Sequence, residues 1–297
     1  MRSLEPENED DVDRSFLCKP TMTLELECHA NTNLPIEVQG ITPDQLKGCS
    51  ESQIASCKIW FGRKQIEIGK LFRVRGRIDE TETIVWQGNL QSVHWIGAGL
   101  TAGTMLIESD AGRHIGSQMR GGNISAQANV SDFVGVEMSG GTVRIHGNAG
   151  DLVGGNYPGS RFGMNRGTIL IDGDAGRGTG QSMRRGTIAI GGNVGKLCGW
   201  NMLAGTIFVF GQCASEPGTG MTRGTIVLAG KSASPPVTFS PGGSYDSCTL
   251  GLMSNWLQRF DFEPASRLLE KRFQLWHGDK LNGGRGELLV ADGDRGN

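Results

Sequence analysis

Residues 167–209 read GTILIDGDAGRGTGQSMRRGTIAIGGNVGKLCGWNMLAGTIFV, and one pattern begins again at Gly186 and at Gly205. Its period is 19 residues: a short alternating apolar stretch, a glycine-rich turn, and a Gly-x-x-Met sequence. Extended in both directions, the pattern gives repeat-opening glycines at positions 103, 122, 141, 167, 186, 205 and 224. One spacing, from 141 to 167, is 26 residues, which indicates an insertion of seven residues in that repeat.

Each repeat predicts one coil of a parallel β-helix. The alternating β-branched residues of Gly-Thr-Ile-x-Ile favour a short, half-buried strand. The Gly-Asn-Ala-Gly and Gly-Asp-Ala-Gly sequences that follow tolerate the positive φ angles of a sharp corner. A coil of 19 residues cannot bury its apolar side alone, so stacked neighbours must form the core. A helical interpretation fails because glycine costs about 1 kcal/mol per residue in a helix.

The chain divides into four predicted regions around this repeat. We expect a disordered acidic extension at 1–16, a small α+β cap at 17–84, and about seven to eight coils at 85–231. Residues 232–297 are predicted as a linker, a helix over 251–275, and a C-terminal tail. The methionines of the repeat and the small-residue column of Ala111, Val130, Ala149, Ala175, Val194 and Cys213 should point into the core.

Composition excludes several classes of protein. Glycine contributes 47 of 297 residues, above the usual ~7%, yet no Gly-X-Y run indicates collagen. The net charge of −2 argues against a nucleic-acid-binding protein. No apolar stretch reaches the length of a membrane span, and the acidic N-terminus lacks the apolar region of a secretory signal. Seven scattered cysteines without C-x-x-C favour a reduced, cytoplasmic protein.

The sequence offers little catalytic chemistry. Its five histidines form no H-x-H or H-E-x-x-H pair, so no hydrolytic zinc site and no catalytic site of its own are expected. Asp172 and Asp174 are two residues apart, and glycoside hydrolysis needs two opposed carboxylates. A free-standing β-helix enzyme acting on polysaccharide therefore remains one alternative, although solvated turn residues are the favoured interpretation of the pair.

Arginines and the insertion supply the candidate binding residues. Arg166 and Arg185 occupy the position directly before a repeat-opening glycine, and Arg184 lies beside them. Stacked like charges repel and are better tolerated when an anion or a carboxylate lies beside them. The column therefore indicates either a solvated face, which is the simpler interpretation, or an edge that binds an acidic subunit or an anionic cofactor tail. The insertion, 155–163, carries Tyr157, Arg161 and Phe162, whose aromatic and arginine character is typical of partner contacts.

These motifs together resemble a known family. The repeats, the Tyr157-Pro-Gly loop before Met164, the Ile41-Thr-Pro-Asp44 sequence and the Trp276…Gly278-Asp279…Glu287 tail are similar to the C subunit of formylmethanofuran dehydrogenase. The gamma subunit of the formyltransferase/hydrolase complex belongs to the same family. A related repeat forms a domain of the large subunit of glutamate synthase. The resemblance extends from about residue 20 to residue 290.

The resemblance implies a right-handed parallel β-helix that serves as a non-catalytic scaffold. Partner subunits would transfer a formyl group from tetrahydromethanopterin to a methanofuran-type carrier and hydrolyse it to formate. This chain would bind no cofactor alone, and Arg166, Arg184 and Arg185 could meet the anionic tail of the carrier. Tyr157, Arg161, Phe162 and Trp276 are expected to contact other subunits of the complex.

Two further alternatives follow from the same resemblance. As the C subunit of a molybdenum or tungsten formylmethanofuran dehydrogenase, the chain would leave the pterin and the iron–sulfur clusters to its partner subunits. As a glutamate-synthase-like domain standing alone, it would bind glutaminase and flavin subunits. The cap around Ile41-Thr-Pro-Asp44 argues against this last alternative.

Overall fold

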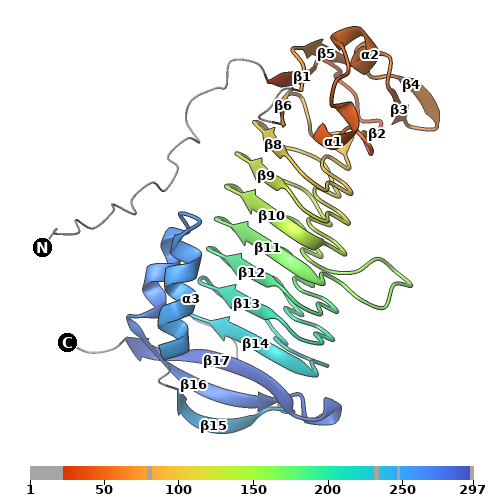
Figure 1. Cartoon of the computed structure of the whole chain (residues 1–297). Coiled ribbons are helices and arrows are strands. Elements are labelled where there is room, and N and C mark those ends of the chain that lie inside the picture. Colours follow the sequence, from red (N-terminus) through yellow and green to blue (C-terminus); the bar gives the residue numbers. More distant parts are fainter. Residues whose placement is uncertain (1–22, 79–81, 231–233, 246–247, 295–297) are drawn as a thin grey trace, which may run out of the picture.

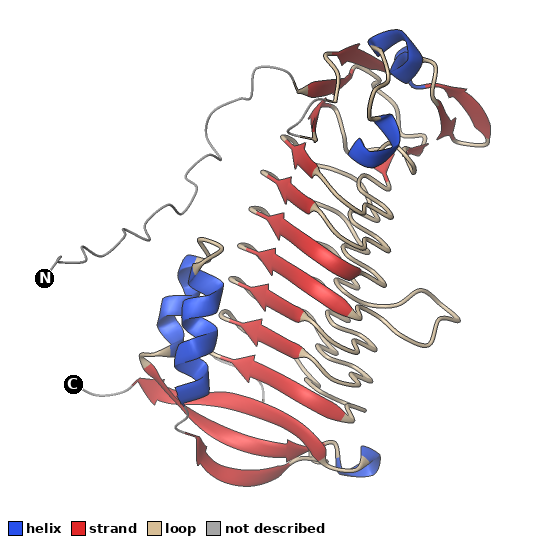
Figure 2. Ribbon diagram, viewed as in Figure 1, coloured by secondary structure: helices blue, strands red, loops and turns tan. Residues whose placement is uncertain are grey.

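The structure is a computed structural model that describes residues 23–78, 82–230, 234–245 and 248–294. It shows a rod of stacked strands with short strands and helices at one end and an antiparallel ribbon with a helix at the other (Figure 1, Figure 2). The acidic extension expected at residues 1–16 lies outside the described residues. No helix within the described ranges is long and apolar enough to cross a membrane.

One large, mainly parallel sheet runs the length of the rod. Each of the seven repeat-opening glycines lies at the start of one of its strands, so the 19-residue period is the distance from one strand to the next. Thr168, Thr187, Thr206 and Thr225 are paired side by side across these strands. The strands are β8 (Thr104–Ile107), β9 (Asn123–Ala126), β10 (Ser139–Ile145), β11 (Arg166–Ile171), β12 (Thr187–Ile190), β13 (Thr206–Val209) and β14 (Arg223–Leu228).

A second column of parallel bridges runs beside the strands. It joins Leu90, Ala111, Val130, Ala149, Ala175, Val194 and Cys213 in order, as the small-residue column predicted. The core lies between this column and the strands. The predicted inward position of the repeat methionines is also confirmed, because the side chains of Met119, Met138, Met164, Met183, Met202 and Met221 are fully buried.

Side chains at one corner link each coil to the next. Asn148 accepts a hydrogen bond from the backbone N–H of Asp174 at 2.8 Å, and Asn129 accepts one from Asn148 in the same way. Asp174 and Asn193 continue this ladder toward the C-terminus. The ladder satisfies backbone donors that the short strands leave unpaired at the corner.

Replacing Asn148 by alanine is expected to lower the free energy of unfolding by about 1 kcal/mol, because the N–H of Asp174 loses its acceptor. Urea denaturation followed by circular dichroism measures this loss. Asn148→Asp is the matched control, since aspartate already accepts the equivalent bond at Asp110 and Asp174. A loss as large for aspartate as for alanine would contradict the role of the ladder.

The N-terminal end of the rod combines two sheets. β1 (Leu24–Cys28) pairs in parallel with β6 (Thr83–Gly88) and antiparallel with β5 (Phe72–Arg75), and so extends the large sheet. A smaller sheet packs beside it in the order β4-β3-β2-β7. The remaining elements here are β2 (Ile36–Glu37), α1 (Pro43–Leu46), α2 (Glu51–Ala55), β3 (Lys58–Phe61), β4 (Lys64–Glu67), η2 (Ile68–Lys70) and β7 (Val93–His94).

The C-terminal end differs from the sequence prediction. The helix expected over 251–275 is present only as α3 (Cys248–Gln258) and the short η3 (Glu263–Leu268), and the helical tail is therefore wrong beyond that point. β16 (Lys271–Gly278) pairs antiparallel with β15 (Ser240–Tyr245) and with β17 (Arg285–Asp294), with η4 (Lys280–Asn282) between β16 and β17. β17 pairs in parallel with β14, so the tail hydrogen-bonds to the edge of β14 that would otherwise be open and extends the sheet.

The helical segment covers the outer face of the lower strands. α3 and η3 pack on a second apolar core that includes Leu170, Ala189, Phe208 and Val227 of β11–β14 and Leu289 of β17. We call α3 and η3, together with residues 259–262 between them, the helical clamp. It lies beside the strands in Figure 1.

Candidate functional site

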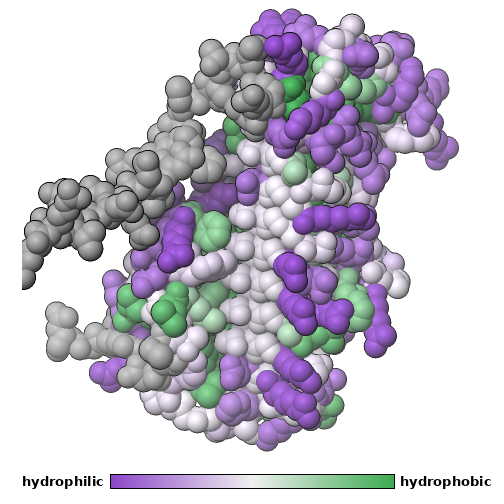
Figure 3. Space-filling view, viewed as in Figure 1, coloured by the Kyte–Doolittle hydropathy of each residue, from purple (hydrophilic) through white to green (hydrophobic). Residues whose placement is uncertain are grey.

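Arginines gather along the side of the rod where the strands begin. Arg166 and Arg223 are the first residues of β11 and β14, and Arg185 directly precedes β12 with Arg184 beside it. Adjacent strands are about 4.8 Å apart, so Arg166 and Arg185 lie close together. We call the exposed set Arg161, Arg166, Arg184, Arg185, Arg223 and Arg285 the arginine edge. Figure 3 shows hydrophilic side chains in a row along this side of the rod.

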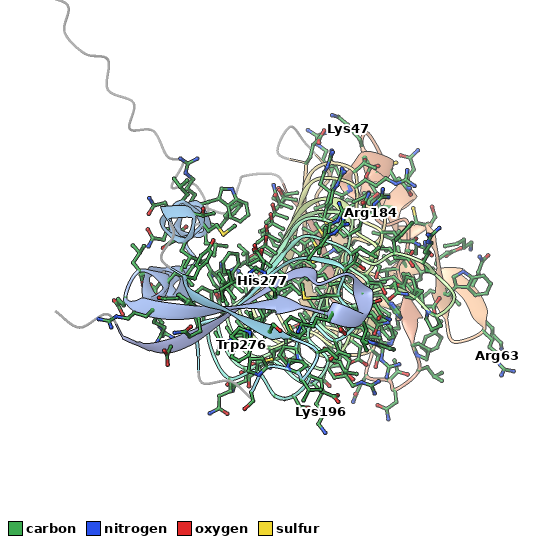
Figure 4. All side chains as sticks on the ribbon, turned by 90° about the horizontal axis from the view of Figure 1, so that it is seen from below. Lys47, Arg63, Arg184, Lys196, Trp276 and His277 are labelled. Atoms are coloured by element: carbon green, nitrogen blue, oxygen red, sulfur yellow. The ribbon has the colours of Figure 1, made fainter. Side chains whose placement is uncertain are left out.

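Within the described residues, no carboxylate pairs with the arginine edge. The ion pairs of the described structure involve other basic residues: Lys47, Lys58, Arg73, Arg113, Arg144 and His146. In Figure 4, Arg184 points outward on the same side of the rod as Lys47, while Arg63 and Lys196 lie elsewhere. The arginine edge therefore presents unpaired guanidinium groups to a ligand or a partner.

The insertion contributes directly to this edge. Phe162 lies in contact with two cations, since the guanidinium carbons of Arg161 and Arg184 are 5.2 and 5.1 Å from the centroid of its ring. Both distances are within the range of a cation–π interaction. The structure thus brings three of the predicted residues together: Arg161 and Phe162 from the insertion, and Arg184 from the following coil.

The other end of the insertion meets a stack of rings that we call the aromatic corner, formed by Trp95, His114, Phe133 and Tyr157. The rings of Trp95 and His114 stack with centroids 4.1 Å apart, and those of His114 and Phe133 with centroids 4.8 Å apart. Trp95, His114 and Phe133 are 19 residues apart and share the same backbone conformation, with φ angles of 69°, 66° and 67°. Tyr157 lies across them, 5.6 Å from His114 and 5.9 Å from Phe133 between centroids.

Hydrogen bonds hold Tyr157 in this position. Its hydroxyl donates to Oγ of the buried Ser117 at 2.9 Å and lies 2.8 Å from Nδ1 of His114. Because the phenol gives its only proton to Ser117, Nδ1 of His114 acts as the donor to the phenol oxygen. The backbone N–H of Tyr157 donates to Glu137 at 3.2 Å. The insertion is therefore anchored to two earlier coils.

Burial shapes the protonation of this corner. The pKa of His114 is lowered to about 4, mainly by burial and to a lesser extent by the nearby His94 and Arg113, while Asp132 acts in the opposite direction. Burial also lowers the pKa of His94, whose Nδ1 accepts the backbone N–H of Arg113 at 2.9 Å. Burial raises the pKa of the Tyr157 hydroxyl above its usual value. Both histidines are therefore neutral near pH 7.

We expect the protein to lose stability as the pH falls from about 6.5 to 4. In that range the unfolded chain protonates His114, whose unfolded pKa is about 6.5, while the folded state keeps it neutral. His114→Asn, which can still donate to Tyr157, should reduce the fall in Tm between pH 7.5 and pH 4.5. His94, whose pKa burial also lowers, contributes to the fall in the same direction. An unchanged fall in the variant, measured by scanning calorimetry, would contradict this assignment.

The two aspartates considered for catalysis already have structural partners. Asp172 binds Arg144 at 2.5 Å and His146 at 2.9 Å, and Asp174 accepts the backbone N–H of Asn193 at 2.6 Å. They are therefore engaged rather than free to act on a polysaccharide. Among the described residues, no group of three or more His, Cys, Asp or Glu side chains is placed to hold a metal ion.

Trp276 lies apart from the other predicted contact residues. It belongs to β16, where it is paired with Leu288 of β17, and its side chain is only partly buried against the main core. Figure 4 shows it on a different side of the rod from Arg184. The sequence interpretation missed Trp95, His114 and Phe133, although their spacing of 19 residues was a usable signal.

The comparisons with known proteins agree with one another, although no family model matches the chain. The C subunit of the molybdenum-containing formylmethanofuran dehydrogenase 1 of Methanothermobacter marburgensis is 38% identical over 83 residues, 28% of this chain. The C subunit of the tungsten-containing formylmethanofuran dehydrogenase 2 of the same organism is 31% identical over 87 residues. The chain matches only 21% and 32% of the length of these two curated relatives.

A solved structure matches over nearly the whole chain. It is a chain of the formyltransferase/hydrolase complex (FhcABCD) of Methylorubrum extorquens in complex with methylofuran, 30% identical, with a TM-score of 0.82. The match covers 90% of this chain and 98% of that chain. The fold and the site define a glycine-rich repeat protein with exposed arginine and aromatic surfaces. The chain belongs to the family of formylmethanofuran dehydrogenase C subunits.

Proposed function

We propose that this chain is a non-catalytic scaffold subunit of a cytoplasmic formyltransferase/hydrolase complex in one-carbon metabolism. Partner subunits would transfer a formyl group from tetrahydromethanopterin to a methanofuran-type carrier and release it as formate. The observation that carries the proposal is the match of 98% of a chain from such a complex, at a TM-score of 0.82. Two observations support a role in assembly. Within the described residues the arginine edge has no ion-pair partner, and the aromatic corner is half-exposed.

The fold proposed for this role is a right-handed parallel β-helix between two ends of different architecture. The 19-residue register of the parallel strands and the second column of bridges support it. We place the cap at 17–84, the coils at 85–231 and the C-terminal region at 232–297. A rod of this kind has several separate surfaces that different subunits can contact at the same time, which suits a subunit that holds others in place.

The contacts proposed for partner subunits are Tyr157, Arg161, Phe162 and Trp276. Aromatic residues and arginine are enriched where interfaces carry most of their binding energy. Tyr157 and Phe162 are half-buried and Arg161 is exposed, so each side chain of the insertion is partly held by the rod and partly accessible to another subunit. Trp276 would contribute from the ribbon at the other end of the rod.

A second candidate function is supported by the curated relatives. All six matches are named as the C subunit of a molybdenum- or tungsten-containing formylmethanofuran dehydrogenase. In that case the pterin, the metal and the iron–sulfur clusters would belong to partner subunits. The near-complete match to the FhcABCD chain favours the hydrolase complex over this redox complex.

Native purification through a tag on this chain tests the proposal. We expect a formyltransferase and a zinc hydrolase-like subunit to co-purify in fixed ratio, identified by mass spectrometry, without molybdenum, tungsten or stoichiometric iron. Molybdenum or tungsten together with iron would establish the dehydrogenase instead. A chain that elutes alone and monodisperse would overturn the scaffold role in both complexes.

A further inference from the structure

We propose that Cys198 and Cys213 form a redox site, a thiol pair that closes to a disulfide between two consecutive coils when the protein meets a low-molecular-weight disulfide. The pair belongs neither to the arginine edge nor to the aromatic corner, and the inference does not depend on the proposed function. The oxidant is a small disulfide compound, and a small thiol drives the reverse reaction.

The first support is the stacking of the two coils that carry the thiols. Cys198 follows β12 and Cys213 follows β13, so the two residues belong to consecutive coils (Figure 1). Val194 forms a parallel bridge with Cys213, and the backbone N–H of Gly218 donates to the carbonyl of Cys198 at 2.7 Å. The corner of one coil therefore lies directly over the corner of the next. Stacked coils are about 4.8 Å apart, which is inside the range of about 4.4 to 6.8 Å between the Cα atoms that a disulfide joins.

The second support is the contact between the two thiols. The thiol of Cys198 is hydrogen-bonded to that of Cys213, and this bond together with burial raises the pKa of Cys198 well above its ordinary value. Cys198 is 0% exposed and Cys213 is 3% exposed, and both belong to the main core. Both are free thiols in the structure. Two thiols in contact inside a packed core need only a small displacement to form a bond with each other.

The third support is the sequence of the two columns that contain these cysteines. Every other residue in the bridge column of Cys213 is aliphatic. The column of Cys198 holds a β-branched residue in each preceding coil: Ile96, Ile115, Val134, Val153 and Thr179. Because apolar or β-branched side chains fill these positions elsewhere in the rod, packing alone does not require a cysteine at either position. The two columns each have their cysteine on the one pair of coils where the thiols meet.

The reaction is a thiol–disulfide exchange in two steps. Cys213, the less buried of the two, attacks one sulfur of the small disulfide as a thiolate, the S–S bond of the reagent breaks, and one small thiolate leaves. Cys198 then loses its proton and attacks the sulfur of Cys213, which releases the second small thiolate. The two cysteines give up two electrons and two protons, and the reagent takes up both to become two thiols. Because the thiols are buried, the rate depends on transient opening of the coil.

The disulfide would stabilise the part of the rod that the helical clamp covers. The clamp packs on the outer faces of β12, β13 and β14, and the two thiols lie in the coils that contain these strands. A cross-link between residues 198 and 213 closes a short loop and stabilises the fold mainly by restricting the unfolded chain. We expect the oxidised protein to have a Tm about 5 °C above that of the reduced protein.

Mass spectrometry of the full-length protein tests the proposal, because trypsin releases both thiols in one peptide. The peptide 197–223 follows Lys196, ends at Arg223 and contains no other cysteine and no internal lysine or arginine. The protein is incubated with oxidised glutathione a few degrees below its Tm, denatured in N-ethylmaleimide and digested without a reductant. We expect the peptide to be lighter than its reduced form by two hydrogen atoms and to carry no maleimide. Dithiothreitol added before the alkylation should restore two maleimides.

Three variants, each compared in its oxidised and reduced forms by scanning calorimetry, locate the effect. C198A and C213A keep one thiol each, so neither should lose the two hydrogen atoms or gain Tm on oxidation. C28A is the matched control, because Cys28 is also a core thiol, 3% exposed, but lies in β1 at the other end of the rod. It should form the disulfide and gain Tm as the unaltered chain does.

The unaltered chain alone decides the outcome, even where a variant does not fold. Two maleimides on the peptide after oxidation would overturn the proposal, because the thiols would then have resisted the oxidant. One glutathione held on either cysteine would also overturn it, since the second thiol would then be too distant to complete the exchange. A disulfide that forms only after unfolding in urea, or that lowers the Tm, would show that the bond does not fit the stacked coils.

Discussion

Replacing Met183 by alanine is expected to lower the free energy of unfolding by about 2–5 kcal/mol, the range found for large-to-small changes in protein cores. Met183 is fully buried, and its terminal methyl group lies only 2.8 Å from the point where a Cβ on Gly205 would be. The thioether therefore fills space that exists because the next coil has a glycine there. Alanine would leave a cavity shared by two coils.

The same contact repeats along the rod. The methyl groups of Met138, Met164 and Met202 lie equally close to the Cβ positions of the glycines that open the coils above them, Gly167, Gly186 and Gly224. Met183→Leu, which nearly conserves the side-chain volume, should cost less than about 1.5 kcal/mol. Urea denaturation monitored by circular dichroism distinguishes the two variants. A loss under about 1 kcal/mol for alanine would show that the core relaxes around the cavity.

This contact explains why the repeat was predictable from sequence. The glycine that opens a coil and the methionine three residues before the previous opening glycine depend on each other, so both recur with the same period. The isoleucines of strands such as Thr187–Ile190 recur because Ile188 and Ile190 both lie in the main core, while Ala189 between them lies in the second core on the outer face. A repeat makes each of these restraints visible several times in one chain.

The C-terminal region was less predictable because its partners are distant in sequence. Residues 271–275 have apolar positions that suit either a helix or a strand. The structure makes them a strand because β17 pairs in parallel with β14 and then offers its free edge to β16. No local pattern contains the information that residues 223–228 and 285–290 become neighbours.

The part of the candidate site that follows the repeat was predictable, and the part that depends on the insertion was not. Arg166, Arg184 and Arg185 follow the repeat, so their common side could be inferred from spacing alone. The contact of Phe162 with Arg161 and Arg184, and that of Tyr157 with His114, depend on how the insertion folds back. An insertion has no period, so its direction could not be derived from the sequence.

Arg144 provides the second large expected effect, through a contact that spans more than a hundred residues. Its side chain is 14% exposed and binds Asp172 at 2.5 Å. It also donates to the backbone carbonyls of Phe260 at 3.3 Å and Asp261 at 3.4 Å, with its guanidinium carbon 5.0 Å from the ring centroid of Phe262. One side chain thus attaches the helical clamp to the outer face of β10.

Arg144→Ala is expected to cost about 3 kcal/mol, because a largely buried ion pair is broken and Asp172 keeps a carboxylate with only His146 beside it. Arg144→Lys should lose less, since lysine keeps the charge but cannot serve the carboxylate and both carbonyls together. R144A/D172N should be more stable than R144A alone, because it removes the unpaired charge.

Hydrogen exchange shows whether the loss is local to the clamp. In R144A, amides of α3 and η3 should exchange faster at the same pH, while those of β8 and β9 should keep their protection, because the coils do not depend on the clamp for their pairing. His146→Ala is the matched control: its side chain is 39% exposed, and an exposed pair with Asp172 contributes little. If β8 and β9 lost protection together with the clamp, the clamp and the rod would unfold as one unit, and Arg144 would stabilise the whole chain rather than one attachment.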